Sequence, residues 1–337
     1  MKRPLSLARR QLGFAVGVAL RRPFDVCVQL TDRCNMRCDF CGLWSRGTDA
    51  GQELTVREHE RISEDLARLG TCLVSLEGGE PLLRHDLADI VRAYARFHLP
   101  VVYTNGWLVD RTTARMLFDA GLTQAGVSID FVDPAHHDAH RGLNGAHSRA
   151  WDAVDLLREA APHGGAQVHV MTILMRENQG EIVDLLRLSS QHRVGHHITL
   201  ISPRRAGHGR GLLPDAGISA RLLGLRRRYR HFATFRDYLA GIDTFVTGRR
   251  QPRCRMGRQM LNIGAAGDVT PCNEKLDWVS GNLRSEPLAR LFPRVRRSPA
   301  VAECQDCWLL CRGFAHVLGR GGTVRGWIDL STRMMSR

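Results

Sequence analysis

The amino-acid sequence predicts an α/β fold, a partial (β/α)6 TIM-like barrel followed by a small cysteine-rich domain. Three observations support this prediction. β-rich runs alternate with helical patterns over the first two thirds of the chain, polar and glycine residues recur where those runs end, and five cysteines gather after the alternation stops. At 337 residues the chain is long enough for one large core and a smaller second domain.

The alternation extends from residue 24 to about residue 230 and is typical of βα units around a parallel sheet. We expect strands near residues 24–31, 72–77, 100–104, 125–130, 167–174 and 197–202. We expect helices near residues 55–69, 86–98, 110–120, 147–160, 178–192 and 214–230. Six such units indicate an incomplete barrel or an open curved sheet.

The whole chain divides into five predicted segments. They are an N-terminal helix in residues 1–23, the barrel in 24–230, a connector in 231–253, the cysteine-rich domain in 254–313 and a tail in 314–337. The cysteine-rich domain is short of long helices and rich in turn signals, which is typical of a small module held together by metal.

The first segment predicts a basic amphipathic helix, because Leu5, Ala8, Leu12 and Ala19 recur at helical spacing among arginines. Its uninterrupted apolar run from Leu12 to Leu20 is far shorter than the roughly 20 residues that span a bilayer. Two alternatives stay open. The helix packs against the end of the barrel, or it makes a peripheral contact with an anionic membrane surface.

The charge of the chain is strongly positive, with a formal net charge of +14 and 48 basic residues. Only Lys2 and Lys275 are lysines, so the excess resembles a general use of arginine in place of lysine. No DNA-binding or RNA-binding module pattern is visible. We therefore expect no nucleic-acid partner.

The ten cysteines are grouped rather than spread evenly. Grouping favours metal ligands in a reducing compartment over a disulfide framework, so we expect a cytoplasmic protein, with association at a membrane surface as the alternative. Cys27 and Cys72 stand alone inside strand patterns, and we expect both to be small buried side chains without a role.

The first group, Cys34, Cys38 and Cys41, places three thiolates on one loop after the first strand. Three close soft ligands can hold three irons of a 4Fe-4S cluster and leave the fourth iron open. A zinc site would need a fourth ligand, for which His59 is the candidate, and pairs of the Cys-x2-Cys type. We favour the iron–sulfur cluster.

The pattern Cys-x3-Cys-x-aromatic-Cys after a first strand resembles the radical S-adenosylmethionine (SAM) superfamily. The resemblance covers roughly residues 24 to 313 and implies that the open iron binds SAM, that an electron cleaves it, and that the resulting 5′-deoxyadenosyl radical abstracts hydrogen from a substrate. It also implies a reducing partner such as flavodoxin or ferredoxin. Phe40 stands at the aromatic position that lies near the adenine in this family.

Later strand ends resemble the SAM-contacting motifs of the same superfamily. They imply SAM contacts from Gly78, Gly79, Glu80, Pro81, Asn105, Ser128 and Asp130. Arg141 and Arg149 are alternative partners for the SAM carboxylate, and the sequence does not choose between them.

The segment after Asp130 resembles peptide-maturing and sulfatase-maturing branches of the superfamily, with one departure. Phe131 replaces the usual glycine, and we expect it to reshape the substrate side of the pocket. The histidines at 136, 137, 140, 196 and 197 lie close enough in sequence to act as pairs of metal ligands, but we expect them to be solvated loop residues.

The second cysteine group resembles the SPASM or shorter twitch extension, which houses auxiliary 4Fe-4S clusters. A complete SPASM domain has seven cysteine ligands, so five cysteines imply one auxiliary cluster. The ligand set expected is Cys254, Cys272, Cys304 and Cys307. For Cys311 three roles stay open: a replacement ligand, a hydrogen donor to a substrate radical, or a bystander thiol.

The function implied is that of a radical SAM oxidoreductase acting on a small natural-product or peptide substrate by dehydrogenation, epimerisation or cross-linking. One alternative is a maturase of a ribosomal peptide, protein or cofactor. A second alternative, from another class, is a non-catalytic iron–sulfur or zinc-binding protein.

Overall fold

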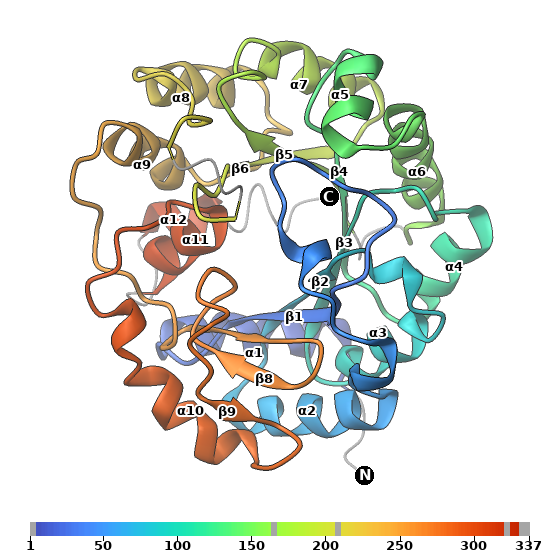
Figure 1. The fold of residues 1–337 in the computed structure, drawn as a ribbon, viewed down its shortest axis with the longest axis vertical. Helices are drawn as coiled ribbons and strands as arrows, with labels where there is room; N and C mark the ends of the chain where they lie inside the picture. Colours follow the sequence, from blue (N-terminus) through green and yellow to red (C-terminus); the bar gives the residue numbers. More distant parts are fainter. Residues whose placement is uncertain (1–4, 163–166, 206–209, 320–323, 330–337) are drawn as a thin grey trace.

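A computed structural model describes residues 5–162, 167–205, 210–319 and 324–329 (Figure 1). Within these ranges nine strands form one sheet in the order β6-β5-β4-β3-β2-β1-β7-β8-β9. The strands are β1 Asp25–Thr31, β2 Leu73–Gly78, β3 Leu99–Thr104, β4 Gln124–Ser128, β5 Gln167–Leu174, β6 Gly195–Leu200, β7 Met260–Ile263, β8 Asp268–Thr270 and β9 Gly281–Asn282. The six strands expected from the sequence and the partial-barrel architecture are confirmed.

Strands β1 to β6 are parallel, and β7 adds a further parallel strand on the free edge of β1. The register pairs Asp25 with Leu73 and Cys27 with Ser75. Because side chains alternate along a strand, Asp25 and Cys27 of β1 lie on one face, together with Leu73, Ser75 and Glu77 of β2. That face is the inside of the barrel. Strands β8 and β9 then continue the sheet in antiparallel fashion.

Helices surround the sheet in a ring (Figure 1). The helices are α1 Leu7–Ala19, α2 Val56–Leu69, α3 Leu87–Ala95, α4 Arg111–Asp119, α5 Pro134–Arg141, α6 Ala146–Ala160, α7 Ile182–Gln191, α8 Ile218–Arg228, α9 Arg236–Val246, α10 Leu288–Arg296, α11 Leu310–Leu318 and α12 Val324–Asp329. Short 3-10 turns are η1 Leu43–Ser45, η2 Ala50–Gln52, η3 Pro81–Leu83 and η4 Pro299–Val301. The six helices expected from periodicity are confirmed, whereas α5 and α9 were not anticipated.

The open side of the barrel, beside β6, is covered by helix α11 and the segment that precedes it (Figure 1). Trp308 stacks on Tyr238 of α9 with ring centroids 5.9 Å apart, and its indole N–H donates to the Tyr238 carbonyl oxygen over 3.0 Å. Helix α9 lies inside the range expected to be a connector, and α11 spans the expected boundary at residue 313. The domain boundaries therefore stay predictions.

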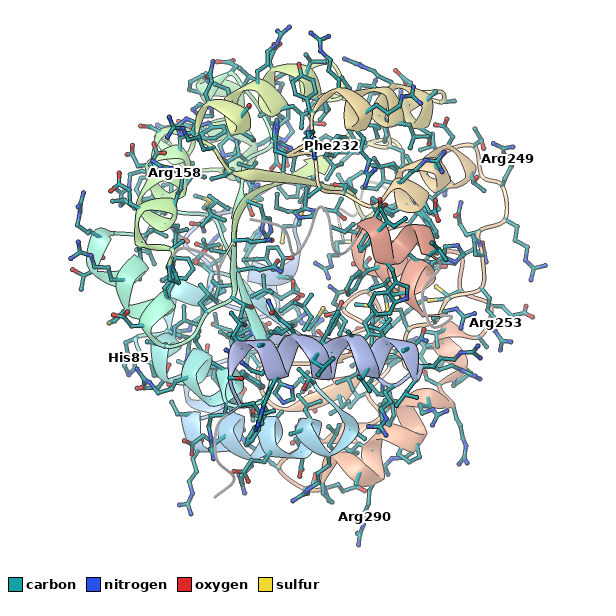
Figure 2. All side chains as sticks on the ribbon, turned by 180° about the vertical axis from the view of Figure 1, so that it is seen from behind. His85, Arg158, Phe232, Arg249, Arg253 and Arg290 are labelled. Carbon is teal, nitrogen blue, oxygen red and sulfur yellow. The ribbon has the colours of Figure 1, made fainter. Side chains whose placement is uncertain are left out.

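Helix α1 crosses the back of the molecule, on the side away from the viewer of Figure 1 (Figure 2). Phe14 of α1 meets Phe24 and Phe314 with ring centroids 6.3 and 6.5 Å apart, and the Arg10 guanidinium donates to the His98 carbonyl oxygen. The expectation that this helix packs against the barrel is confirmed. Residues 1–4, with Lys2 and Arg3, lie outside the described residues. No helix in the described ranges is long and apolar enough to cross a membrane.

Arginines are spread around the perimeter of the molecule. Figure 2 shows Arg158, Arg249, Arg253 and Arg290 pointing outward on different sides, whereas Phe232 lies in the interior. These four arginines therefore do not form one groove.

Candidate active site at the carboxyl ends of the strands

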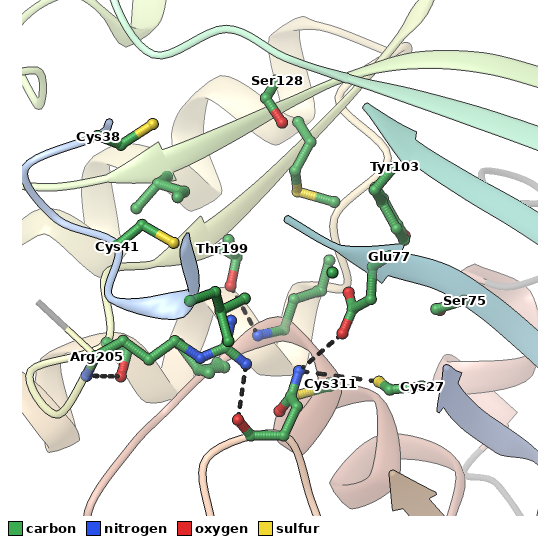
Figure 3. Close-up of a pocket in the computed structure, with 18 of the residues that line it drawn as sticks. Cys27, Cys38, Cys41, Ser75, Glu77, Tyr103, Ser128, Thr199, Arg205 and Cys311 are labelled. Carbon is green, nitrogen blue, oxygen red and sulfur yellow. Dashed lines mark hydrogen bonds between the residues drawn. The ribbon is translucent and has the colours of Figure 1, made fainter. Parts of the chain in front are cut away.

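A cavity of about 310 Å³ lies inside the barrel, between the loops that follow the strands and the C-terminal module (Figure 3). Side chains from both parts of the chain form its wall. From the barrel come the three cysteines of the first group, together with strand residues such as Ser75 and Ser128. From the C-terminal module come Asn273, Glu274, Leu309, Leu310, Cys311 and Phe314.

The first cysteine loop follows β1 and is held by the end of helix α5. The Arg37 amide donates to the Arg141 carbonyl oxygen over 3.1 Å, and the Asp39 amide donates to that of His140 over 3.3 Å. Gly142 ends α5 in the left-handed conformation at φ 64°, where a side chain would also press against the Arg37 carbonyl. These contacts turn all three cysteines of the loop toward the cavity.

The thiols of this loop are poorly solvated. Burial raises the pKa of the Cys38 thiol to about 11, and the nearby Arg141 guanidinium opposes that shift. Burial also raises the pKa of the Cys34 thiol. Without metal these thiols are therefore neutral, and metal binding releases their protons. Three thiols that line one cavity from a single loop fit a cluster with one open iron.

The candidate fourth ligand of a zinc site, His59, lies away from the three cysteines of the loop. His59 lies on the buried face of helix α2, where its Nδ1 is 3.1 Å from the Tyr94 hydroxyl oxygen. It does not line the cavity.

Gly78 and Gly79 end β2 against the start of the cysteine loop. A methyl group added at Gly79 would overlap the Arg33 carbonyl oxygen, and one added at Gly78 would overlap that of Thr31. The Gly79 amide donates to the Thr31 carbonyl oxygen over 2.7 Å. The sequence suggested that these glycines serve ligand approach, whereas here they also let two loops of the site pack backbone to backbone.

Glu80 is fully buried and joins the loop after β2 to the end of β3. Its carboxylate accepts hydrogen bonds from the Thr104 hydroxyl and the Asn105 amide, each over 2.8 Å, and from the Leu82 amide over 3.1 Å. Burial raises the pKa of Glu80, and these bonds oppose the rise. Pro81 begins the turn η3 and lies outside the cavity wall.

Of the two candidate arginines, Arg141 lines the cavity and Arg149 does not. Arg141 forms an ion pair with Asp130, which is fully buried and accepts from the Ile173 amide over 2.8 Å. The Arg141 guanidinium carbon also lies 5.3 Å from the centre of the Phe40 ring. Arg149 instead donates to the Trp107 carbonyl oxygen over 2.8 Å.

The predicted SAM contacts are therefore mostly brought together. Those that line the cavity are Phe40, Gly78, Gly79, Glu80, Asn105, Ser128 and Arg141, while Pro81, Asp130 and Arg149 lie behind the wall. Asp130 does not contact the cavity itself and acts on it by orienting the Arg141 guanidinium. Asn105 supports the cysteine loop, because its amide nitrogen donates to Asn35 Oδ1 over 2.8 Å.

Two expectations about this region are wrong. Phe131 is fully buried and does not line the cavity, because its ring stacks on His136 and His140 at centroid distances of 4.1 and 4.6 Å. The histidines at 136, 137 and 140 belong to helix α5, and those at 196 and 197 are buried in β6, so none of the five is a solvated loop residue.

Electrostatic interactions link all five late cysteines, because Cys311 also interacts with Cys307 and Cys272. Cys254, Cys272 and Cys307 are buried and influence one another electrostatically, as do Cys254 and Cys304. Burial raises the pKa of Cys272 to about 12. Cys311 differs because it lines the cavity shared with the first cysteine loop (Figure 3).

Sequence reasoning assigned no role to two arginines of this region. Arg312 is buried and donates to the carbonyl oxygens of Cys307, Cys304 and Pro252 over 2.9, 3.1 and 2.8 Å. It therefore fixes the cysteine loops, and its only sequence signal is its place after Cys311. Arg205 lies in the cavity wall and pairs with Glu274 over 2.6 Å. No local pattern joins those two residues.

Comparison with known proteins finds two cyclases among the relatives of this chain. The chain is 26% identical over 309 residues to PqqA peptide cyclase of Rhodopseudomonas palustris, covering 89% of this chain and 77% of that protein. It is 35% identical over 173 residues to GTP 3′,8-cyclase of Pectobacterium atrosepticum, covering 49% of this chain and about half, 51%, of that protein.

Among solved structures, Streptococcus suis SuiB bound to S-adenosylmethionine superposes with a TM-score of 0.62 at 16% identity, covering 81% of this chain and 66% of SuiB. This likeness shows a shared fold. The model of the radical SAM superfamily matches residues 28–189, and that of SPASM, an iron–sulfur cluster-binding domain, matches residues 254–308. Together they cover more than half of the chain, which therefore belongs to the radical SAM superfamily, as an enzyme that uses a 4Fe-4S cluster, SAM and an auxiliary iron–sulfur cluster in a C-terminal SPASM domain.

Proposed function

We propose that this radical SAM enzyme is an oxidoreductase that abstracts hydrogen from a substrate held in the cavity between its two cysteine groups. The observation that carries the proposal is the cavity itself. Cys41 and Cys311 both line it, although they come from opposite ends of the sequence. A molecule in this space therefore touches both halves of the site.

The first cysteine group would hold the cluster that binds SAM, through Cys34, Cys38 and Cys41. Phe40 and Arg141 would contact SAM, with the guanidinium facing its carboxylate. Asp130 acts as a positioning residue because its buried ion pair aims that guanidinium. When bound, the cluster and SAM supply a hydrogen-abstracting radical.

The residues of the chain prepare the cavity for that chemistry. Apolar side chains line part of its wall and would exclude water from the reacting atoms. They include Met36, Phe40, Leu43, Trp44, Leu309 and Phe314.

The auxiliary cluster would be held by Cys254, Cys272, Cys304 and Cys307. The matched SPASM region ends at residue 308, before Cys311, and Cys311 lines the cavity. Both observations favour a thiol that faces substrate, as a hydrogen donor would, over a cluster ligand.

The substrate class and the net reaction form the second part of this proposal. The alignment with PqqA peptide cyclase covers 89% of this chain, which favours a peptide substrate and the role of a peptide maturase. A small natural product is the alternative substrate. Dehydrogenation, epimerisation and cross-linking all begin with the same hydrogen abstraction.

The proposal is tested on protein reconstituted without oxygen. We expect about eight irons per chain and reductive cleavage of SAM to 5′-deoxyadenosine. The C254A/C272A variant should lose one cluster and keep the other, whereas the C311A variant should keep both. Zinc in place of iron, or no cleavage of SAM by the wild type, would contradict the proposal.

Two partners belong to this proposal. A flavodoxin or ferredoxin would supply the electron. An anionic membrane surface would receive helix α1, because its outward residues Leu12, Val16 and Leu20 are 66%, 45% and 58% exposed. Exposed arginines, Arg9 at one end and Arg21 at the other, flank this apolar face.

A further inference from the structure

Two carboxylates stand inside the barrel with no ion pair to a basic side chain in the described residues, although the Arg205 guanidinium acts on Glu77 from a greater distance. Asp25 opens strand β1, Glu77 lies near the end of β2, and both line the cavity proposed above to hold substrate. Figure 3 shows Glu77 above Cys27 and facing the same space as Cys311. Asp25 belongs to no motif of the superfamily resemblance, and Glu77 opens the glycine-rich motif at residues 77–81 without being one of its predicted SAM contacts.

The other charges in the cavity wall already have partners. Arg141 pairs with Asp130, and Arg205 pairs with Glu274. Glu80 accepts three hydrogen bonds. Apart from Arg141, which would also face the SAM carboxylate, these groups are compensated within the protein by an ion pair or by hydrogen bonds.

Asp25 and Glu77 differ from these groups. Asp25 is only 4% exposed, and its Oδ1 atom has no hydrogen-bond partner among the described residues. Glu77 accepts one long hydrogen bond, 3.3 Å from the Asn273 amide nitrogen. Neither carboxylate has a basic side chain within ion-pair distance in the described parts of the chain.

Burying an unpaired carboxylate costs free energy, so such a group is retained where a ligand compensates it. Burial and the charge of Glu77 raise the pKa of Asp25 to about 8. Both carboxylates line the same cavity, with Asp25 opposite Leu73 and Glu77 four residues further along β2, so a cation inside the cavity is attracted by both.

We propose that the cavity selects a substrate bearing a protonated amino group, which Asp25 and Glu77 receive inside the barrel. This inference rests on the proposed function for the identity of the cavity as the substrate site. An amine side chain of a peptide and an amine of a small molecule present the same chemistry. A carboxylate or phosphate in the same place would face uncompensated repulsion.

The test compares three probes of one length and different charge, n-pentylammonium, 1-pentanol and pentanoate. Each is titrated into the reconstituted full-length holoenzyme with saturating SAM, by calorimetry. We expect saturable binding of n-pentylammonium at least about tenfold tighter than that of 1-pentanol, and no binding of pentanoate. Saturating SAM prevents the probe from occupying the SAM site itself.

The D25N/E77Q variant should lose this preference for the cation. The single variant E77Q, which changes a partly exposed residue, should weaken the preference severalfold and guards against a folding defect in the double variant. E159Q removes an exposed carboxylate outside the cavity and should bind the probes like the wild type. Equal binding of all three probes by the wild type, or an undiminished preference in both cavity variants, would overturn the inference.

This outcome is separable from that of the proposed function. Probe binding requires no turnover, whereas the proposed function is judged by cleavage of SAM in the wild type. An enzyme that cleaves SAM but ignores n-pentylammonium contradicts only the inference.

Discussion

At the scale of single residues, the buried carboxyl group of Asp25 lowers the free energy of unfolding at neutral and higher pH. Its pKa is raised from 3.8 to about 8, so between these values the folded protein holds a proton that the unfolded chain releases. The free energy of unfolding then falls as the pH rises through this window. In the substrate-free protein, the destabilisation by Asp25 should therefore be greatest above pH 8.

The variant D25N removes the titrating group and keeps its shape. We expect D25N to unfold at a higher temperature than the wild type, with a difference that grows from pH 6 to pH 8. Thermal unfolding of reconstituted protein measures it. D237N, on the surface of α9, is the control and should show no such trend. A D25N variant less stable at every pH would mean that Asp25 supports the fold instead.

Arg141 and Arg149 form a natural pair for testing contact with SAM. R141Q removes the guanidinium group that lines the cavity, whereas R149Q removes a hydrogen bond to the Trp107 carbonyl oxygen outside the cavity. We expect R141Q to weaken SAM binding at least about tenfold and R149Q to leave it nearly unchanged. Equilibrium dialysis with reconstituted protein decides between them, and equal losses would remove Arg141 from the site.

The sequence predicted the residues of this site unevenly. Cys34, Cys38 and Cys41 were predictable because their spacing on one loop is itself the ligand geometry. Asp25, Glu77 and Arg205 were not, because only the curvature of the sheet and the docking of the C-terminal module bring them to one cavity. A single carboxylate at the start of a strand carries no local signal.

At the scale of elements, the glycine turn after β2 supports the cysteine loop. A methyl group at Gly79 would overlap the Arg33 carbonyl oxygen, one residue before Cys34. We expect G79A to displace that loop and to lose roughly half of the bound iron, since the auxiliary cluster is unaffected. G180A is the control, because nothing lies within 4 Å of an added methyl group there. Iron analysis after reconstitution measures both, and full iron in G79A would contradict the expectation.

Helix α1 buries Phe14 and Val18 against the protein and also presents the apolar side chains of Leu12 and Val16 to solvent. We expect the protein to sediment with vesicles that contain phosphatidylglycerol and not with pure phosphatidylcholine. The triple variant L12E/V16E/L20E should weaken this binding at least about tenfold, because it places acids on the apolar face.

A matched control for that variant changes exposed apolar residues elsewhere. Met116 and Val279 are 44% and 50% exposed, on α4 and beside β9. The M116E/V279E variant should sediment like the wild type. Loss of vesicle binding in both variants would indicate an effect of total charge rather than of α1.

Secondary structure was predictable where periodicity was long and apolar. Helix α2 buries Ile62 and Leu66 one turn apart and begins at a capping box formed by Thr55 and Glu58, so both its face and its start are visible in the sequence. Helix α5 is eight residues long, and its buried side chains are His137 and Arg141. It has no apolar stripe, and its position depends on the cysteine loop packed against it.

At the scale of the whole molecule, the barrel and the C-terminal module are tied together by Arg284. Its guanidinium donates to Glu58 over 2.7 Å and to the carbonyl oxygens of Gln52 and Glu53, each over 3.0 Å. Residues 52–58 lead into helix α2, and Arg284 follows β9. This link fixes the module on the edge of the sheet, although neither residue belongs to a cysteine motif.

The Glu58–Arg284 pair should therefore couple the stabilities of the two parts. A double-mutant cycle with E58Q, R284Q and both should give a coupling free energy of about 0.5–1 kcal/mol, because Arg284 is substantially exposed and solvent screens the pair. Glutamine at 58 can keep the capping box, so the cycle isolates the charge. Unfolding followed by loss of cluster absorbance provides the measurement.

The pH dependence of that coupling has a definite sign. The Arg284 hydrogen bond lowers the pKa of Glu58 from 4.5 to about 2, so the folded protein keeps this carboxylate ionised where the unfolded chain binds a proton. The stabilisation is present in full above pH 4.5 and is lost as the pH falls toward 2. We expect equal coupling at pH 8 and pH 6 and a decrease only below about pH 4.5. A coupling that already weakens between pH 8 and pH 6 would mean that another titrating group, and not Glu58, joins the module to the barrel.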